Sequence, residues 1–118
     1  MAFGWRQYKM SFEKITVVGS GAWGTALAQM LGLAGKEVTL YVRNENLARD
    51  IETHKENREY LAGVILSNNI KTESNLEKAV SDKDILLMVV PTQFTRQALK
   101  NIKSYISDNT ILVCAQKG

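Results

Sequence analysis

The residues with the clearest chemical potential are three glycines in the stretch Gly19-Ser20-Gly21-Ala22-Trp23-Gly24, spaced as G-x-G-x-x-G. In a turn that binds a pyrophosphate, each glycine has its own physical reason. Gly19 allows a tight turn, Gly21 leaves no β-carbon in the path of a phosphate, and Gly24 lets the following helix lie close to a sheet. The first backbone N–H groups of that helix would then donate hydrogen bonds to phosphate oxygens.

The segments on either side of this turn have the composition that such a site needs. Lys14-Ile15-Thr16-Val17-Val18 is short, apolar and β-branched, which is typical of a buried parallel strand. Residues 25–34 follow as a helix, and the apolar residues from the turn onward are Ala22, Ala26, Leu27, Met30, Leu31 and Ala34. The order strand, glycine turn, helix favours a dinucleotide site over a glycine turn that binds nothing.

The composition indicates one globular domain, with 118 residues, 45% of them hydrophobic and 23% charged. The net charge of +3 is scattered without a run of basic residues, so we expect no nucleic-acid partner. No stretch has the length of a membrane span, and Met1–Ser11 lacks the apolar core of a signal peptide. We regard residues 1–12 as an N-terminal extension with no assigned role.

The single cysteine, Cys114, cannot form a disulfide within the chain, which fits a reducing, cytoplasmic location. Because it ends the apolar run Ile111-Leu112-Val113-Cys114, we expect a buried side chain rather than a reactive thiol.

Strands and helices alternate along the rest of the chain. The expected further strands are Glu37–Val42, Ile70–Glu73, Ile85–Val90 and Thr110–Ala115. One expected helix begins at an Asn44 cap and ends at about Glu52. A second, short helix begins with the capping box Ser74-Asn75-Leu76-Glu77 and has Ala79 and Val80 inward. A third begins at a Thr92 cap, and the residues on its one apolar face are Phe94, Ala98, Leu99, Ile102 and Tyr105. This alternation predicts an α/β fold, a Rossmann-like doubly wound parallel sheet with right-handed crossovers.

In such a sheet, ligands bind at the carboxyl ends of the strands, at the switch between the first and fourth strands. Four segments are predicted to meet at that edge: Gly19–Gly24, Arg43, Pro91–Phe94 and Gln116–Gly118.

The residue that ends the second strand bears on which dinucleotide is bound. An acid at this place usually bonds the ribose hydroxyls of NADH, but here the sequence is Tyr41-Val42-Arg43-Asn44. The planar guanidinium of Arg43 suits a 2′-phosphate, and Glu45 could still reach a ribose. The sequence thus leaves both NADPH and NADH open.

Beyond the glycines, the stretch from Gly19 to Ala28 resembles the opening of bacterial NAD(P)-dependent glycerol-3-phosphate dehydrogenases, with an aromatic residue before the third glycine and then Thr-Ala-Leu-Ala. Further matching segments follow in the family's order: Val42-Arg43-Asn44, His54-Lys55-Glu56-Asn57 with Tyr60-Leu61, Val89-Val90-Pro91-Thr92-Gln93 and Gln116-Lys117-Gly118. The resemblance spans residues 13–118. It implies an NAD(P)-binding Rossmann domain over these residues, truncated before the family's helical C-terminal domain.

The resemblance also implies roles for single residues. Ser20, Ala22 and Trp23 would contact the cofactor together with the three glycines of the turn. Arg43 would lie at the adenosine ribose or its 2′-phosphate, and Pro91 and Phe94 would flank the ribose and nicotinamide. Lys117 would lie between cofactor and substrate. No catalytic residue and no metal ligand is assigned, because the family's catalytic lysine lies in the C-terminal domain.

The reaction that the resemblance implies is the interconversion of dihydroxyacetone phosphate and sn-glycerol 3-phosphate with NAD(P)H, for glycerophospholipid synthesis. The partner would be a small phosphorylated substrate, and the full-length family member would be a homodimer. Two alternatives stay open: a stand-alone or remnant dinucleotide-binding module without activity, and another two-domain dehydrogenase with a similar first domain. The lone His54 is expected to have a surface role.

Overall fold

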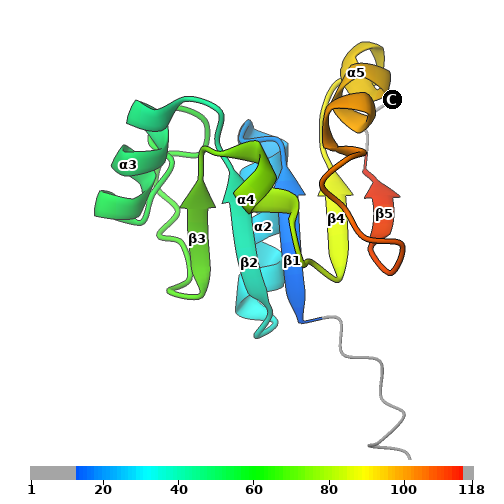
Figure 1. Ribbon diagram of the computed structural model, residues 1–118. Helices are drawn as coiled ribbons and strands as arrows, with labels where there is room; N and C mark the ends of the chain where they lie inside the picture. Colours follow the sequence, from blue (N-terminus) through cyan, green and yellow to red (C-terminus); the bar gives the residue numbers. More distant parts are fainter. Residues whose placement is uncertain (1–12, 116–118) are drawn as a thin grey trace, which may run out of the picture.

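The computed structural model describes residues 13–115, which form a five-stranded parallel sheet with helices between the strands. The elements in chain order are β1 (Lys14–Val18), α2 (Ala22–Leu33), β2 (Glu37–Tyr41), α3 (Glu45–His54), β3 (Ile70–Glu73), α4 (Leu76–Val80), β4 (Ile85–Met88), α5 (Thr92–Ile102) and β5 (Ile111–Cys114). The strand order is β3-β2-β1-β4-β5, and every neighbouring pair is parallel (Figure 1). The expected Rossmann-like sheet, with its switch between the first and fourth strands, is confirmed.

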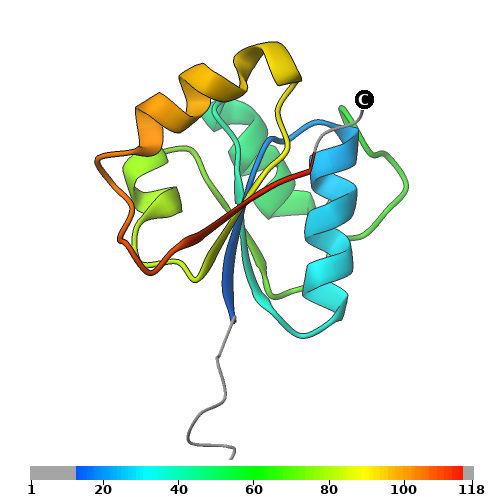
Figure 2. The same ribbon diagram turned by 90° about the vertical axis from the view of Figure 1, so that its right-hand side faces the viewer.

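Two hydrophobic cores lie on opposite faces of the sheet. Figure 2 shows the sheet edge-on, with α2 on one side and α4 and α5 on the other. The buried side chains on the α2 and α3 side are Val17, Ala28, Val38, Leu40, Val42, Ala48, Ile51, Leu66 and Ile70. Those on the α4 and α5 side are Val18, Ala79, Val80, Leu86, Met88 and Ile102. Because strand side chains alternate, Val17 and Val18 enter different cores, and both faces of β1 are buried.

Helix α2 packs on the sheet through small residues rather than through its large apolar ones. Its buried residues are Gly24, Thr25, Ala28 and Gly32, whereas Met30 is 64% exposed. A β-carbon at position 32 would lie 2.9 Å from side-chain carbons of Ile70, so the helix approaches β3 closely. The helix also begins three residues earlier than expected, at Ala22. It is followed by Gly35, whose φ of +86° favours glycine.

Two expected helix caps are wrong. Asn75, not Ser74, caps α4, since its side chain accepts a hydrogen bond from the Lys78 N–H. Helix α5 begins at Thr92 itself, and Pro91 takes the cap position. By contrast, Asn44 caps α3 as expected, accepting from the N–H groups of Asn46 and Leu47.

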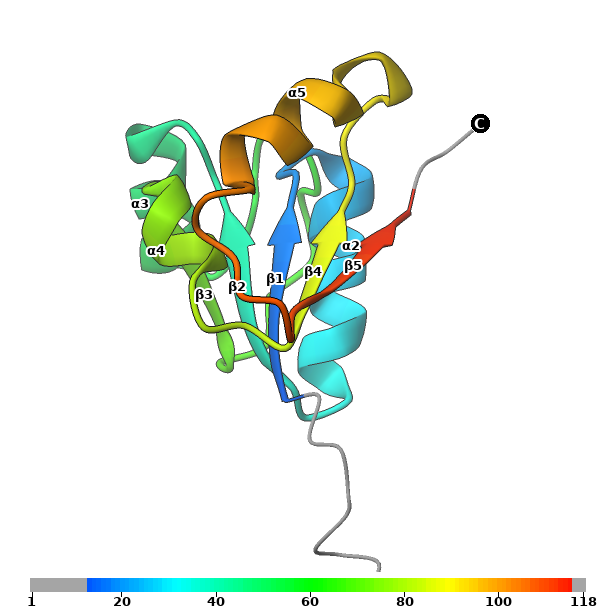
Figure 3. The ribbon, with the colours of Figure 1, turned by 45° about the vertical axis from the view of Figure 1, so that its right-hand side comes forward.

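The carboxyl-terminal part of the described chain is less buried than expected. Phe94 is 56% exposed, and Tyr105 lies beyond the end of α5 and is 39% exposed, so neither belongs to the inner face of that helix. Cys114 is exposed, together with the rest of β5, which corrects the expectation of a buried thiol. β5 lies at one edge of the described sheet, where it pairs with β4 (Figure 3), and neither hydrophobic core includes a residue of β5.

Candidate functional site

The carboxyl ends of β1, β2 and β4 bring the predicted site segments together along one edge of the sheet. β1 leads directly into the glycine turn, β2 into Arg43 and β4 into Pro91, and α2 and α5 both begin at this edge (Figure 3). Residues 116–118, including Lys117, lie outside the described residues.

Gly19 is required by the fold of the turn itself. Its φ is +136°, a conformation that side chains other than that of glycine rarely adopt. A β-carbon here would also lie 2.9 Å from the carbonyl carbon of Val89, because the turn after β1 lies against the segment after β4. The N–H of Val89 donates to the carbonyl of Val18 at 2.8 Å, which extends the pairing of β1 and β4 up to the turn.

Gly21 is required by neither conformation nor packing. Its φ of −71° and ψ of −172° are open to any residue, and a β-carbon at this position would meet no protein atom within 4 Å. Of the six glycines in residues 13–115, the other five either have a positive φ or would bring a β-carbon into close contact. Gly21 therefore leaves an open approach to the backbone at the start of α2.

The start of α2 has the electrostatic character of an anion site. The first backbone N–H groups of a helix lack partners within the helix and carry the positive end of its dipole. Gly21 offers no capping side chain, and the first turn of α2 contains no acidic residue to compensate that charge. These features, together with the open backbone at Gly21, fit a phosphate group.

A groove of about 470 Å³ adjoins this edge, between the ends of the strands and helices α4 and α5. Its lining residues are Val18, Tyr41, Arg43, Leu76, Val90, Gln97, Ala98, Asn101 and Ile102. Most of the lining is apolar, and Arg43 is the one cation among the lining residues within 13–115. Such a groove suits a planar apolar ring beside an anionic group.

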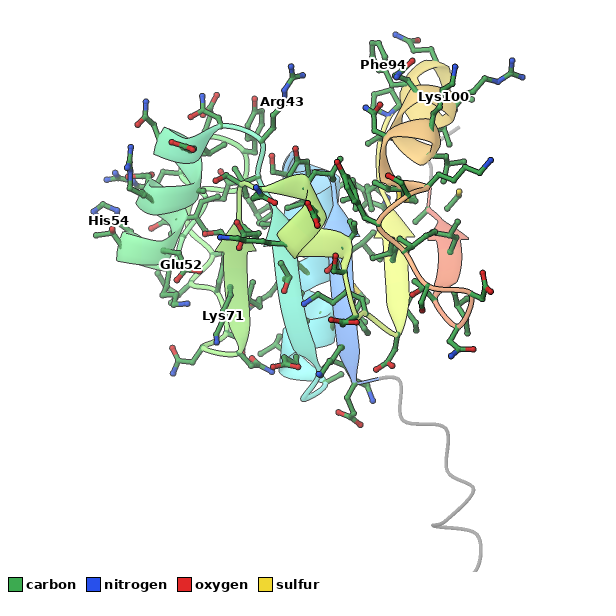
Figure 4. All side chains as sticks on the ribbon, in the orientation of Figure 1. Arg43, Glu52, His54, Lys71, Phe94 and Lys100 are labelled. Atoms are coloured by element: carbon green, nitrogen blue, oxygen red, sulfur yellow. The ribbon has the colours of Figure 1, made fainter. Side chains whose placement is uncertain are left out.

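Arg43 and Glu45, the two residues considered for the ribose, line different hollows. Arg43 lines the groove at the switch point, and Figure 4 shows it above the end of β2. Glu45 lines a separate hollow between α3 and β3, together with Glu52 and Glu73. The geometry therefore favours Arg43 as the side chain beside a ligand that enters the groove.

The remaining described site residues are exposed at the same edge. Ser20 is partly buried and Ala22 is exposed, Trp23 in the first turn of α2 is 50% exposed, and Pro91 and Phe94 at the start of α5 are exposed as well. Figure 4 shows Phe94 at the tip of α5. Exposed aromatic rings at this edge are available to contact a ligand.

A buried polar cluster lies beneath the turn. Asn57 and Thr25 are both fully buried, and the Asn57 side chain is bonded to the turn at Ser20. In the sequence, Asn57 stands out only as part of a segment that resembles the family. Its partners lie 37 and 32 residues away in the chain, so no local pattern could have revealed the cluster.

A polar cluster of Asp50 and His54 on α3 and Arg58 in the segment after it lies apart from this edge. Arg58 donates to both carboxylate oxygens of Asp50, and this hydrogen bonding holds the pKa of Asp50 below its ordinary value and raises that of Arg58. His54 lies 3.2 Å from the same carboxylate and is exposed, so its expected surface role is confirmed (Figure 4).

Comparisons with known proteins agree with the geometry. Residues 14–118 match the model of a family described as NAD-dependent glycerol-3-phosphate dehydrogenase N-terminus. A glycerol-3-phosphate dehydrogenase [NAD(P)+] of Bacillus thuringiensis is 42% identical over 105 residues, which are 89% of this chain and 31% of the relative. A solved glycerol-3-phosphate dehydrogenase of Plasmodium falciparum has a TM-score of 0.84 at 30% identity, over 97% of this chain and 35% of that one.

A glycerol-3-phosphate dehydrogenase of Coxiella burnetii is also similar, with a TM-score of 0.84 at 26% identity, over 92% of this chain and 34% of that one. The fold is thus that of a Rossmann-type domain. The chain belongs to the family of NAD-dependent glycerol-3-phosphate dehydrogenases, of which it matches the N-terminal domain. It spans about a third of the length of the relatives it matches. Within residues 13–115, no helix is both long and apolar enough to cross a membrane.

Proposed function

We propose that this chain is the cofactor-binding part of an oxidoreductase that interconverts dihydroxyacetone phosphate and sn-glycerol 3-phosphate with NADPH or NADH, in the supply of glycerophospholipids. The observation that carries the proposal is Gly21, a glycine that the protein's own packing and conformation do not explain. A dinucleotide pyrophosphate explains it, because the phosphate must approach the backbone where a β-carbon would project. The family of the chain supports the choice of reaction.

The residues of this chain would bind and orient the cofactor. The N–H groups at the start of α2 would donate to the pyrophosphate oxygens, and Arg43 would bond to the adenosine ribose or its 2′-phosphate. Pro91 and Phe94 would flank the ribose and nicotinamide. When bound, the reduced nicotinamide supplies a hydride for the carbonyl carbon of the ketone. The orientation of one reactant in this way removes part of the entropic barrier to the reaction.

The roles of Lys117 and of a dimer rest on the resemblance alone. Lys117 would be a cation between the cofactor and the phosphorylated substrate, and the full-length protein would be a homodimer. Residues 13–118 would be the cofactor-binding unit, and residues 1–12 an extension with no assigned role.

Calorimetric titration of the chain with NADPH and with NADH tests the proposal. The parent should bind at least one of them, and Gly21→Val should abolish binding because its branched side chain takes the place of the phosphate. Gly21→Ala should weaken binding to an intermediate degree. Thermal unfolding of both variants is the control, since open space around position 21 predicts that they stay folded. If folded Gly21→Val bound the cofactors with unchanged affinity, the assignment of a pyrophosphate site to this turn would be wrong.

A further inference from the structure

Asn57 is a fully buried polar residue that lies outside every helix and strand, in the segment between α3 and β3. Its side-chain amide donates to the carbonyl oxygen of Ser20 at 3.0 Å and to Oγ1 of Thr25 at 2.9 Å. Its side-chain oxygen, Oδ1, accepts from the backbone N–H of Tyr60 at 3.2 Å. The orientation of the amide is unambiguous, because the Ser20 carbonyl can only accept and the Tyr60 N–H can only donate.

The Ser20 carbonyl is held by two donors, since Oγ1 of Thr25 also donates to it, at 3.2 Å. A planar trans peptide directs its C=O and its N–H to opposite sides. The described residues contain no cis peptide bond, so the N–H of Gly21 points away from Asn57 and Thr25. That direction is the open side of the turn, where a β-carbon of residue 21 would meet nothing.

We propose that Asn57 is a positioning residue for the phosphate-binding turn. Its buried amide holds the Ser20 carbonyl inward, and thereby keeps the Gly21 N–H directed at the pyrophosphate before the ligand arrives. A turn that is preorganised in this way spends less binding free energy on ordering. This inference rests on the proposed function, because it assumes a pyrophosphate at Gly21.

Attachment of the loop to α2 does not by itself explain Asn57. Two other side chains attach the same loop farther along the helix. The amide of Gln29 accepts from the N–H of Ser67 at 2.8 Å and donates to the carbonyl of Ile65 at 3.1 Å. Asn69 donates to the carbonyls of Gly32 at 2.8 Å and Lys36 at 2.7 Å. Asn57 is the member of this set whose partner belongs to the glycine turn.

The test compares Asn57→Asp with Asn69→Asp in the 118-residue chain, with NAD⁺ and NADP⁺ as ligands. Both substitutions keep the shape of the side chain but replace its NH₂ donor, which faces carbonyl oxygens, with a carboxylate oxygen that can only accept. The two residues contact opposite ends of α2. Asn57→Asp should lower the affinity by about tenfold or more near neutral pH, because the turn loses the donor that orients it. Asn69→Asp should lower thermal stability but leave the affinity within about twofold of the parent.

The pH profile gives a second readout that a merely structural role would not move. A buried carboxyl has a raised pKa, and its protonated form can donate to the Ser20 carbonyl again. The affinity of Asn57→Asp relative to the parent should therefore recover as the pH falls to about 5. Asn57→Ala, which has no proton to donate, should show the loss without the recovery. The ratio to the parent cancels any titration of the ligand itself.

If Asn57→Asp does not fold, the parent and Asn57→Ala still decide the matter. In the parent, the side-chain ¹⁵N–¹H signals of Asn57 should shift when NAD⁺ or NADP⁺ binds, because the amide is bonded to the turn. Suppose that the parent binds, but that Asn57→Ala has unchanged affinity or that the Asn57 and Asn69 variants lose equal affinity. Either result would overturn the positioning role and leave the proposed function intact. A folded parent that binds neither NAD⁺ nor NADP⁺ would overturn the proposed function, and the positioning role with it.

Discussion

Gly24 in the first turn of α2 lies directly against the backbone of Gly19, so that a β-carbon at position 24 would come within 2.8 Å of the Gly19 carbonyl carbon. Neither partner can rotate away, since both contacting groups are backbone. Gly24→Ala should therefore push the helix off the turn and reduce the free energy of unfolding by about 1–3 kcal/mol.

Urea unfolding measures that loss, and Gly21→Ala is the matched control. The same added methyl group meets open space at position 21, so its effect should stay below about 1 kcal/mol. If the two variants lost similar free energy of unfolding, the conclusion that the fold requires Gly24 but not Gly21 would be wrong.

Much of the fold could be predicted from the sequence because local chemistry dictated it. The β-branched run Lys14–Val18 and the short strand Ile70–Glu73 have the bounds that the sequence predicted. Asn44 caps its helix as expected because an asparagine before an amphipathic segment has a local partner in the next turn.

The errors have two causes: adjacent residues that offer the same local cap, and burial that depends on packing between elements. Ser74 and Asn75 are adjacent candidates for one cap, and Asn75 takes the role while its own N–H donates to the Glu73 carboxylate at 3.0 Å. Met30 shares the apolar periodicity of α2, yet close packing on the sheet buries small residues such as Ala28 instead. Cys114 lies in an apolar run that predicts burial, yet no residue of β5 joins either hydrophobic core.

The candidate site was predictable in part, for a similar reason. The glycine turn and Arg43 could be placed because each follows a strand, and parallel strands end at a common edge. The sequence could not predict that Arg43 and Glu45 line different hollows, because this depends on how α3 packs beside β3.

The pair of Asp50 and Arg58 predicts that the stability of the fold depends slightly on pH in the acidic range. The pKa of Asp50 lies below its ordinary value of 3.8, chiefly because of the hydrogen bond from Arg58. A carboxyl whose pKa is lower in the folded state stabilises the fold at pH values above the unfolded-state pKa, and the contribution is lost as the pH falls through the folded-state pKa. The contribution is small because the pair is exposed to solvent.

Arg58→Ala should return the pKa of Asp50 toward its ordinary value, as measured by NMR titration of its carboxyl carbon. His54→Ala is the control and should have the smaller effect, since His54 is a lesser cause of the shift. A pKa of Asp50 that does not change in Arg58→Ala would contradict the assignment.

The 118-residue chain should bind cofactor without turning over dihydroxyacetone phosphate. Hydride transfer to a ketone needs a positioned proton donor and a held substrate in addition to an oriented nicotinamide. The chain spans about a third of the length of its relatives. The resemblance assigns the catalytic lysine to the family's C-terminal domain. The assay is the oxidation of NADPH or NADH, followed by absorbance. Turnover above background that is lost in Lys117→Ala would show that the chain is a complete catalyst.

Arg43 should determine the preference between the two cofactors. It lines the groove at the end of β2, where Glu45 is absent from the lining, so its guanidinium is placed to bond a 2′-phosphate. Arg43→Ala should weaken the binding of NADPH by about 1.5–3 kcal/mol, the range for a hydrogen bond to a charged group, and change that of NADH little. Arg49→Ala is the matched control, because Arg49 is an exposed arginine that lines the other hollow and should affect neither cofactor. Calorimetric titrations of both variants with both cofactors measure these effects, and equal losses for NADPH and NADH in Arg43→Ala would mean that Arg43 does not bind the 2′-phosphate.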